Sequence, residues 1–336
     1  AYSTSTMLDL DGNGKVDAVQ VVFSENIQNP ASDTWTISGA PGGGVKSGIF
    51  RSSPNTIQID ITEGAGAADT AVGSLQFSYN NSSASIKDID NNLTPSIPLT
   101  TPADGAAPVM IAARTGEATG TENGFVDIVH LTFSEPVSVT AGDATLDIGN
   151  LASNTLTGET YVSGGGTNML LFSMTNAQNA GAYDTSELPS GISYTHGTGT
   201  IHIVDFSARA NEAITQTFAG TTDGARPVIV AARTAEATAS VDGFVDMMKL
   251  TYSEAVTIPA GTRSEFDVAN LTSNTLTNEA CAAGGCGSGT KFIEISTANS
   301  LNAGQYDTHE LPASIVYTAA PGIIRDLSPA LNEAPS

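Results

Sequence analysis

Short runs of alternating apolar and polar residues recur along the chain and predict β-strands. In the run 18–23, Val19, Val21 and Phe23 occupy alternate positions, so these three side chains are expected to face a core. We expect the residues that alternate with them to face outward: Ala18, Gln20 and Val22. Such runs are rich in Val, Ile, Thr, Phe and Tyr, are interrupted by Gly, Asn, Asp and Ser, and show no convincing helical period. The pattern predicts an all-β protein.

The same pattern occurs three times. Residues 14–25, 124–135 and 243–254 align without gaps, and each block ends in Ser-Glu. A second block, an Asp-Thr pair ten residues before a Tyr, and a third, an Asp followed by an Asn, recur in the same order in each repeat. Three ordered blocks per repeat make coincidence implausible, so the chain is expected to be a tandem array.

Segments that contain Pro and Gly, at 101–108 and 221–227, separate the repeats. We therefore predict three domains, formed by residues 1–106, 107–225 and 226–336. Repeats of this length that consist of short strands favour an immunoglobulin-like (Ig-like) β-sandwich. The predicted fold is all-β, with three tandem Ig-like β-sandwich domains that form an elongated rod.

The run 131–137, Leu-Thr-Phe-Ser-Glu-Pro-Val, has counterparts at 21–27 and 250–256. Together with the later Asp…Asn pattern, it resembles the tandem bacterial Ig-like repeats of surface-layer (S-layer), adhesin-stalk and other secreted cell-surface proteins. The resemblance covers nearly the whole chain. It implies a scaffold or adhesive role, although such modules also occur as spacers in secreted enzymes.

The charge of the chain narrows the class of partner. Twelve Lys and Arg residues stand against 35 Asp and Glu residues, for a formal net charge of −23. A field this negative repels nucleic-acid phosphates and anionic lipid, so we expect no nucleic-acid partner. No run approaches the roughly 20 apolar residues that cross a bilayer, so we expect no membrane insertion. Divalent cations remain as expected ligands.

Residues 9–17 match the opening of an EF-hand-type calcium loop, because side-chain oxygens at alternate positions can converge on one hard cation. The expected ligands, with Lys15 acting through its backbone carbonyl, are Asp9, Asp11, Asn13, Lys15 and Asp17. Gln20 replaces the usual bidentate Glu, so the site must recruit another carboxylate or bind more weakly. The alternative interpretation is a turn rich in Asp, Asn and Gly without an ion.

The other repeats hold fewer carboxylates at these loop positions, which are Thr119, Thr121, Asn123 and Asp127 in the second repeat, and Thr238, Ser240, Asp242 and Asp246 in the third. Further acidic residues lie nearby in the sequence: Glu117, Glu236 and the linker residues Asp104 and Asp223. We expect them either to bind calcium between domains or simply to be solvated side chains of loops. We expect the recurrent Ser-Glu glutamates to accept a structural hydrogen bond or to bind a cation: Glu25, Glu135 and Glu254. The recurrent Asp residues are expected to fix turns with their Asn partners: Asp88, Asp205 and Asp326.

Cys281 and Cys286 are the only cysteines and enclose a flexible Ala-Ala-Gly-Gly segment. Two sulfurs this close in sequence predict a local disulfide in an exported protein. No nucleophile elbow, P-loop or HExxH motif occurs, so we expect no enzymatic activity.

These observations favour an extracellular structural protein of a bacterial cell surface, such as an S-layer, filament or stalk subunit, which is stiffened by calcium. One alternative is an adhesin that binds a cell-surface glycan or a protein, although a single Trp argues against a carbohydrate platform. Another is the noncatalytic spacer of a secreted hydrolase. The first repeat lacks a counterpart of 108–110 and the third lacks one of 214–220, which predicts head-to-tail self-association into a fibre or lattice, or an excerpt of a longer array.

Overall fold

The computed structural model describes residues 1–28, 34–83, 86–118, 122–177, 183–195, 201–237, 241–281, 286–300, 304–318 and 324–334. Across these ranges the chain forms β-strands and two short 3-10 segments, η1 (Pro41–Gly43) and η2 (Asn81–Ser83), but no α-helix. The all-β prediction is confirmed. The described residues contain no helix with the length and apolar character needed to span a membrane.

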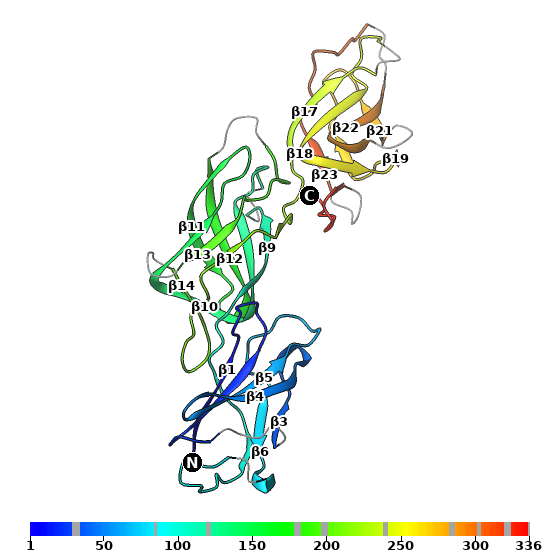
Figure 1. Ribbon diagram of the computed structural model, residues 1–336. Helices are drawn as coiled ribbons and strands as arrows, with labels where there is room; N and C mark the ends of the chain where they lie inside the picture. The colour runs from blue at the N-terminus through cyan, green and yellow to red at the C-terminus, as the bar shows by residue number, and fades with distance from the viewer. Residues whose placement is uncertain are drawn as a thin grey trace.

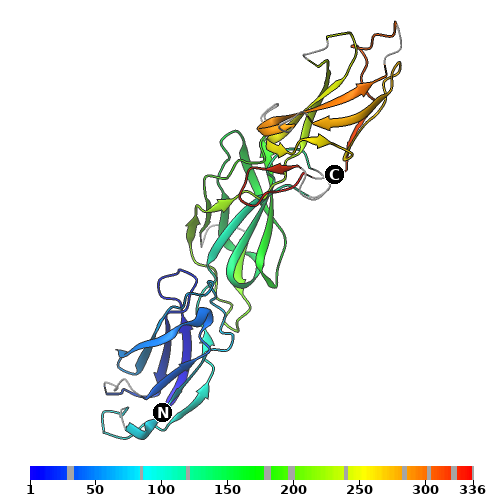
Figure 2. The same ribbon diagram turned by 90° about the vertical axis from the view of Figure 1, so that its right-hand side faces the viewer.

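The strands fall into three groups, which we call the first (β1–β8), second (β9–β16) and third (β17–β24) group. Every strand ladder of the described residues joins strands of the same group. Figure 1 shows the three groups lying one after another from the N-terminus, and the view in Figure 2 agrees.

The first group contains two sheets. A five-stranded sheet has the order β4 (Val45–Ser53), β5 (Thr56–Thr62), β2 (Ala18–Phe23), β1 (Tyr2–Leu8) and β8 (Ala103–Asp104). A three-stranded sheet has the order β3 (Trp35–Ser38), β6 (Gln76–Tyr79) and β7 (Ile97–Thr100). Buried residues of both sheets belong to one hydrophobic cluster, so the sheets pack against each other.

The second group is built around β10 (Ile128–Ile148), whose start pairs with β9 and β12 and whose end pairs with β13. One long strand therefore contributes to both layers. The other strands are β9 (Met110–Gly116), β11 (Thr155–Ser163), β12 (Thr167–Ala177), β13 (Ile192–Thr195), β14 (Ile201–Asp205), β15 (Gln216–Phe218) and β16 (Thr221–Thr222).

The third group has a six-stranded sheet and a two-stranded sheet. The larger sheet contains β17 (Ile229–Ala235), β18 (Met247–Ile258), β22 (Gly287–Asn299), β21 (Leu276–Cys281) and β19 (Gly261–Thr262), and β24 (Arg325–Asp326) also pairs with β18. The smaller sheet pairs β20 (Phe266–Val268) with β23 (Ile315–Tyr317).

The alternation predicted for residues 18–23 is confirmed, because Val19, Val21 and Phe23 are all buried. The prediction for Ala18 was wrong, because its side chain is fully buried. β2 has β1 and β5 on its two sides, and a methyl group presents little surface beyond the cover of these neighbours. A small apolar residue on the outer face of an inner strand is therefore buried even where the alternation points it outward.

Truncation of a core side chain in the second group tests the packing. Leu131 is completely buried, so Leu131→Ala should lower the free energy of unfolding by about 2–5 kcal/mol. The control Val162→Ala alters a side chain that is 51% exposed and should change it by less than about 0.5 kcal/mol. Hydrogen exchange of the β10 and β12 amides measures the difference, and equal effects of the two changes would contradict the assigned core.

Candidate metal centres

The acidic loop of the first group is closed by its own carboxylates. Asp9 accepts the backbone N–H of Gly12 and of Gly14, each at 2.8 Å. Asp17 accepts the N–H of Leu10 at 2.7 Å. Gly14 has φ +88°, a conformation that L side chains rarely adopt, and this lets the backbone turn toward Asp9. The sequence therefore folds into a turn whose carboxylates point inward.

Three of the predicted ligands lie together, since Asp9, Asp11 and Asp17 each offer an oxygen within 4.8 Å of the others. Burial raises the pKa of Asp9 and of Asp17 above the usual value, and the neighbouring carboxylates raise both further against the backbone hydrogen bonds. A cation in the loop would relieve this repulsion.

A fourth carboxylate, that of Glu63, stands beside the loop. The Asn13 amide donates to Asp11 at 3.0 Å and to Glu63 at 2.7 Å. Lys15 Nζ lies 3.9 Å from Glu63. The motif called for an extra carboxylate in place of Gln20, whose own amide donates to Gln58. Glu63 fits that need, but it follows the end of β5, far along the chain from the loop, and no local spacing identifies it.

The corresponding loops of the other groups close differently. Glu117 accepts the N–H of Gly124 at 2.6 Å and that of Asn123 at 3.0 Å, and Glu236 accepts the N–H of Gly243. Burial raises the pKa of Glu117 to about 7. One glutamate thus replaces the aspartate of the first loop. Four predicted positions of these loops lie outside the described residues: Thr119, Thr121, Thr238 and Ser240.

A hydrogen-bonded chain joins the first and second groups. Glu135, 4% exposed in β10, accepts the hydroxyl of Thr70 at 2.6 Å. The Thr70 and Ser134 oxygens are 2.6 Å apart, and Ser134 accepts the N–H of Val109 at 3.0 Å. Because Thr70 has one proton and gives it to Glu135, Ser134 must donate to Thr70.

The same chain joins the second and third groups. Glu254 accepts the hydroxyl of Thr185 at 2.5 Å, Thr185 and Ser253 are 2.8 Å apart, and Ser253 accepts the N–H of Val228 at 3.0 Å. The recurrent Asp-Thr block of one group therefore contacts the recurrent Ser-Glu block of the next. The expected hydrogen bond of these two glutamates is present, but its donor belongs to the neighbouring group.

Each of these glutamates lies in a cluster of three carboxylates. Asp104, Glu135 and Asp205 form the first junction cluster, with oxygens within 4.8 Å of one another. The second junction cluster, with the same spacing, contains Asp223, Glu254 and Asp326. Both clusters combine a linker aspartate, the Ser-Glu glutamate, and an aspartate that ends a short strand.

The third member of each cluster also fixes a turn, as predicted. Asp205 accepts the N–H of Ser207 at 3.0 Å and that of Asn211 at 2.9 Å, and its other oxygen accepts the Asn211 amide at 2.8 Å. Asp326 makes the same contacts with Ser328 and Asn332. These bonds hold the carboxylates in place beside the glutamates.

Burial raises the pKa of Glu135 to about 8, with neighbouring carboxylates acting in the same direction and the Thr70 hydroxyl opposing. Burial and the equivalent neighbours raise the pKa of Glu254 to about 8. Burial likewise raises the pKa of Asp104 and of Asp223 to about 6. Each cluster can therefore hold either protons or a cation at neutral pH.

The surroundings supply further polar groups. A cavity of about 680 Å³ beside the second junction cluster is lined by Thr221, Asp223 and Glu254. The buried Thr221 hydroxyl has no hydrogen-bond partner among the described residues, so it is an additional oxygen donor there. Lys291 of the third group donates to the carbonyl of Tyr183 at 2.8 Å and to Asp184 at 3.2 Å, both in the second group's segment.

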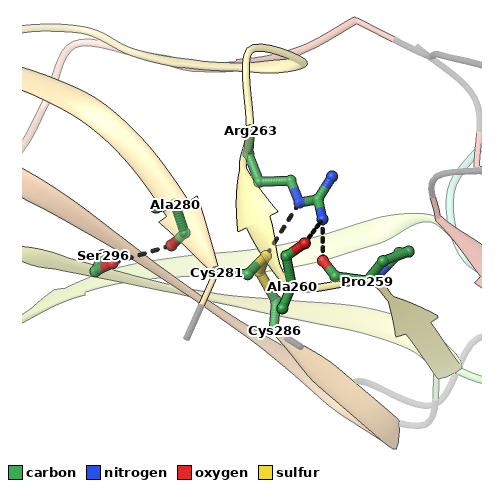
Figure 3. The surroundings of a disulfide bond; sticks show 7 residues. All are labelled: Pro259, Ala260, Arg263, Ala280, Cys281, Cys286 and Ser296. Carbon is green, nitrogen blue, oxygen red and sulfur yellow. Dashed lines mark hydrogen bonds between the residues drawn. A yellow bond between two sulfur atoms is a disulfide. The ribbon is translucent and has the colours of Figure 1, made fainter. Parts of the chain in front are cut away.

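Cys281 and Cys286 are joined by a disulfide, with Cα atoms 4.7 Å apart. Figure 3 shows Arg263 beside it, donating from Nε to the Cys281 sulfur at 3.3 Å and from its terminal nitrogen to the carbonyls of Ala260 and Pro259. Arg263 is 6% exposed, and sequence spacing gave no sign of it. The disulfide and this guanidinium brace one end of the third group's large sheet.

Replacing Thr185 by Val tests the junction contact with little change of side-chain volume. Glu254 and Ser253 lose their shared partner in a buried setting, so Thr185→Val should lower the free energy of unfolding by about 1–3 kcal/mol. The matched control is Thr308→Val at the exposed corresponding position, which should change it by less than about 0.5 kcal/mol. Denaturant unfolding compares the two variants, and equal costs would contradict the assigned contact.

The raised glutamate pKa values predict a pH dependence in the presence of chelator. A carboxyl whose pKa rises from 4.5 to about 8 on folding stabilises the folded state below pH 4.5, and this stability is lost as pH rises toward 8. The melting temperature measured in chelator should therefore fall as the pH is raised from 5 to 8. The double variant Glu135→Gln and Glu254→Gln should show a smaller fall in melting temperature, whereas Glu25→Gln, at the exposed position, should show the same fall as the wild type. If the double variant and the wild type have the same pH profile of melting temperature, burial of the two glutamates does not cause the pH dependence.

No protein-family model matches the chain, and no curated protein matches it. Among solved structures it is similar to surface layer protein SbsC, in a structure of its domains 1–6 (11% identity) and in a crystal structure of rSbsC(31-844) (10% identity). Each match covers 98% of this chain and 58% of the other, with a TM-score of 0.20. The chain thus spans little more than half the length of these proteins, and a TM-score this low carries no argument about fold or function.

Proposed function

We propose that the protein is an extracellular structural component of a bacterial cell surface, a rod of three Ig-like β-sandwich domains stiffened by calcium. The observation that carries this proposal is the junction contact, a buried Glu that accepts a Thr hydroxyl from the preceding group, which occurs in the same form twice. The same contact, formed by the recurrent blocks of the repeat, connects each pair of neighbouring groups, as expected for a structural protein built from repeats.

The proposed domains are residues 1–106, 107–225 and 226–336. In support, the buried apolar residues form three separate clusters, which reach from Met7 to Ala106, from Met110 to Ala225 and from Val245 to Ala334. Each cluster lies within one group of strands. Three separate cores support a division into three domains in series.

Calcium suits the residues present. The loop offers carboxylates from Asp9, Asp11 and Asp17, with the Lys15 carbonyl and Asn13 as further proposed ligands and Glu63 alongside. All of these donors are oxygens, which calcium prefers in sets of about six to eight. The two junction clusters have the same all-oxygen character. When bound, calcium would supply positive charge that offsets carboxylate repulsion and links neighbouring groups.

The rest of the proposal concerns setting and assembly. The disulfide between Cys281 and Cys286 supports an oxidising, extracellular location. The exposed side chains of Val45 and Phe50 lie on β4, an outer strand of the first group's large sheet, and this supports self-association into a fibre or lattice. In this proposed role the carboxylates bind calcium and stabilise the junctions between groups, and the protein is not an enzyme.

Calcium should raise the melting temperature, because a ligand that binds only the folded state adds RT ln(1 + [L]/Kd), about 2.7 kcal/mol at a hundredfold excess over Kd. Asp11→Ala should remove the gain that comes from the loop, and Glu254→Gln the gain that comes from the second junction cluster. Melting curves in calcium and in chelator measure both.

The matched control for these variants is Asp147→Ala, which removes an exposed carboxylate of β10 that belongs to none of the three clusters. It should keep the full calcium response. If all three variants respond to calcium as the wild type does, the proposed calcium sites are wrong.

A further inference from the structure

The two junction clusters have equivalent carboxylates but different surroundings. Each contains a linker aspartate, a buried glutamate and the aspartate of an Asp…Asn turn. The residues around them align position by position, because each linker aspartate precedes a Gly and each turn aspartate is followed six residues later by an Asn. Two of these aligned positions carry residues of different chemistry, and both differences bear on how the clusters bind a cation.

The first difference is a hydroxyl group. Thr221, two residues before Asp223, lines the cavity of about 680 Å³ together with Asp223 and Glu254. Its side chain is 8% exposed, and its hydroxyl has no hydrogen-bond partner among the described residues. The aligned residue at the first junction is Pro102, which is also buried and lines a smaller cavity of about 380 Å³. Proline has no side-chain oxygen, so only the second cluster has a hydroxyl at this position.

The hydroxyl of Thr221 lacks a contact that its environment should provide. A buried hydroxyl without a partner is costly, because it has given up its hydrogen bonds to water. The hydroxyl of the next residue, Thr222, shows the usual solution, since it donates to the carbonyl of Ala113 at 3.2 Å. Calcium binds neutral oxygens as well as carboxylates among its roughly six to eight ligands. An ion held by the neighbouring carboxylates therefore supplies the missing contact.

The second difference is a positive charge. Burial raises the pKa of Asp104 in the first cluster to about 6, and the positive charge of Arg209 opposes that shift. Arg209 therefore lies close enough to offset part of the negative charge of the first cluster. The aligned residue at the second junction is Ala330, which lines the cavity and carries no charge.

Lys291 also brings a positive charge to the second junction, but its ammonium group is already bound. It donates to the carbonyl of Ser253 at 2.7 Å, to the carbonyl of Tyr183 at 2.8 Å and to Asp184 at 3.2 Å. An ammonium group has three donors, and these three acceptors use them all. The carboxylates of the second cluster thus remain available to another cation.

On the basis of the calcium-binding function proposed above, we propose that the two junctions differ in calcium affinity. The second cluster binds calcium more tightly, with the Thr221 hydroxyl as a further ligand beside the three carboxylates, and Arg209 weakens calcium binding at the first cluster. Calcium then occupies the junction between the second and third groups at a lower concentration than the junction between the first and second.

Two variants of the full chain isolate the clusters for calorimetric titration with calcium. Both carry Asp11→Ala, which removes the loop site. One adds Glu135→Gln and keeps the second cluster, and the other adds Glu254→Gln and keeps the first. The variant with the second cluster should bind calcium at least about tenfold more tightly. Equal affinities, or tighter binding at the first cluster, would overturn this proposal and leave the calcium-binding function standing, whereas no binding by either variant would contradict both.

Replacing Thr221 by Val tests the hydroxyl in the variant that keeps the second cluster. Thr221→Val should weaken calcium binding about tenfold, whereas the control Thr222→Val should leave it unchanged, because that hydroxyl already bonds to Ala113. In chelator, Thr221→Val should not lower the melting temperature, because the hydroxyl that it removes has no partner. This second measurement separates a ligand from a merely structural residue. Equal effects of the two substitutions on calcium affinity would show that Thr221 is not a ligand.

Exchanging the charged position tests Arg209. Arg209→Ala, in the variant that keeps the first cluster, should tighten calcium binding about threefold. Ala330→Arg, in the variant that keeps the second cluster, should weaken calcium binding by a similar factor. Circular dichroism confirms that both proteins fold. Unchanged calcium affinities in both proteins would overturn the role of Arg209.

Discussion

The arrangement of the three groups depends on a buried glutamate that accepts its hydroxyl hydrogen bond from the neighbouring group. Glu135 and Glu254 are 4% and 2% exposed, and a buried carboxylate is costly unless it is hydrogen-bonded or paired. In both cases the hydroxyl comes from the group before it. Separating the groups would leave the glutamate without that donor, so the contact restricts how each group can be placed on the next.

Much of the fold follows from short-range pattern. The alternation along residues 18–23 identifies core-facing side chains, because strand geometry sends neighbours to opposite faces. Ala18 departs from that rule, since burial on the second face depends on which strands lie alongside. Pairing partners are also a long-range property. Nothing local to residues 128–148 shows that one strand pairs at its start with β9 and β12 and at its end with β13.

The candidate sites likewise differ in whether their contacts are short-range or long-range in the sequence. The proposed loop ligands Asp9, Asp11 and Asp17 lie within nine residues, so their spacing alone predicts that they lie together. The turn contacts of Asp205 follow from short Asp-to-Asn spacing. Glu63 could not be found in this way, and neither could the partners Thr70 and Thr185, because those contacts join residues 50 or more positions apart. The signal available was that the Asp-Thr and Ser-Glu blocks recur together, which indicates a shared role but not a contact.

The repeat places one residue type in two environments, and this shows what the junction adds. Thr70 and Thr185 are fully buried while Thr308 is exposed, and Glu135 and Glu254 are buried while the side chain of Glu25 is 55% exposed. Local sequence is alike, so burial and the raised glutamate pKa values arise from the neighbouring group. β16, which pairs with β9 of the second group, runs directly into Asp223 of the second junction cluster. Strand pairing in one group therefore positions a carboxylate for the next, and the two kinds of contact are linked through a single stretch of backbone.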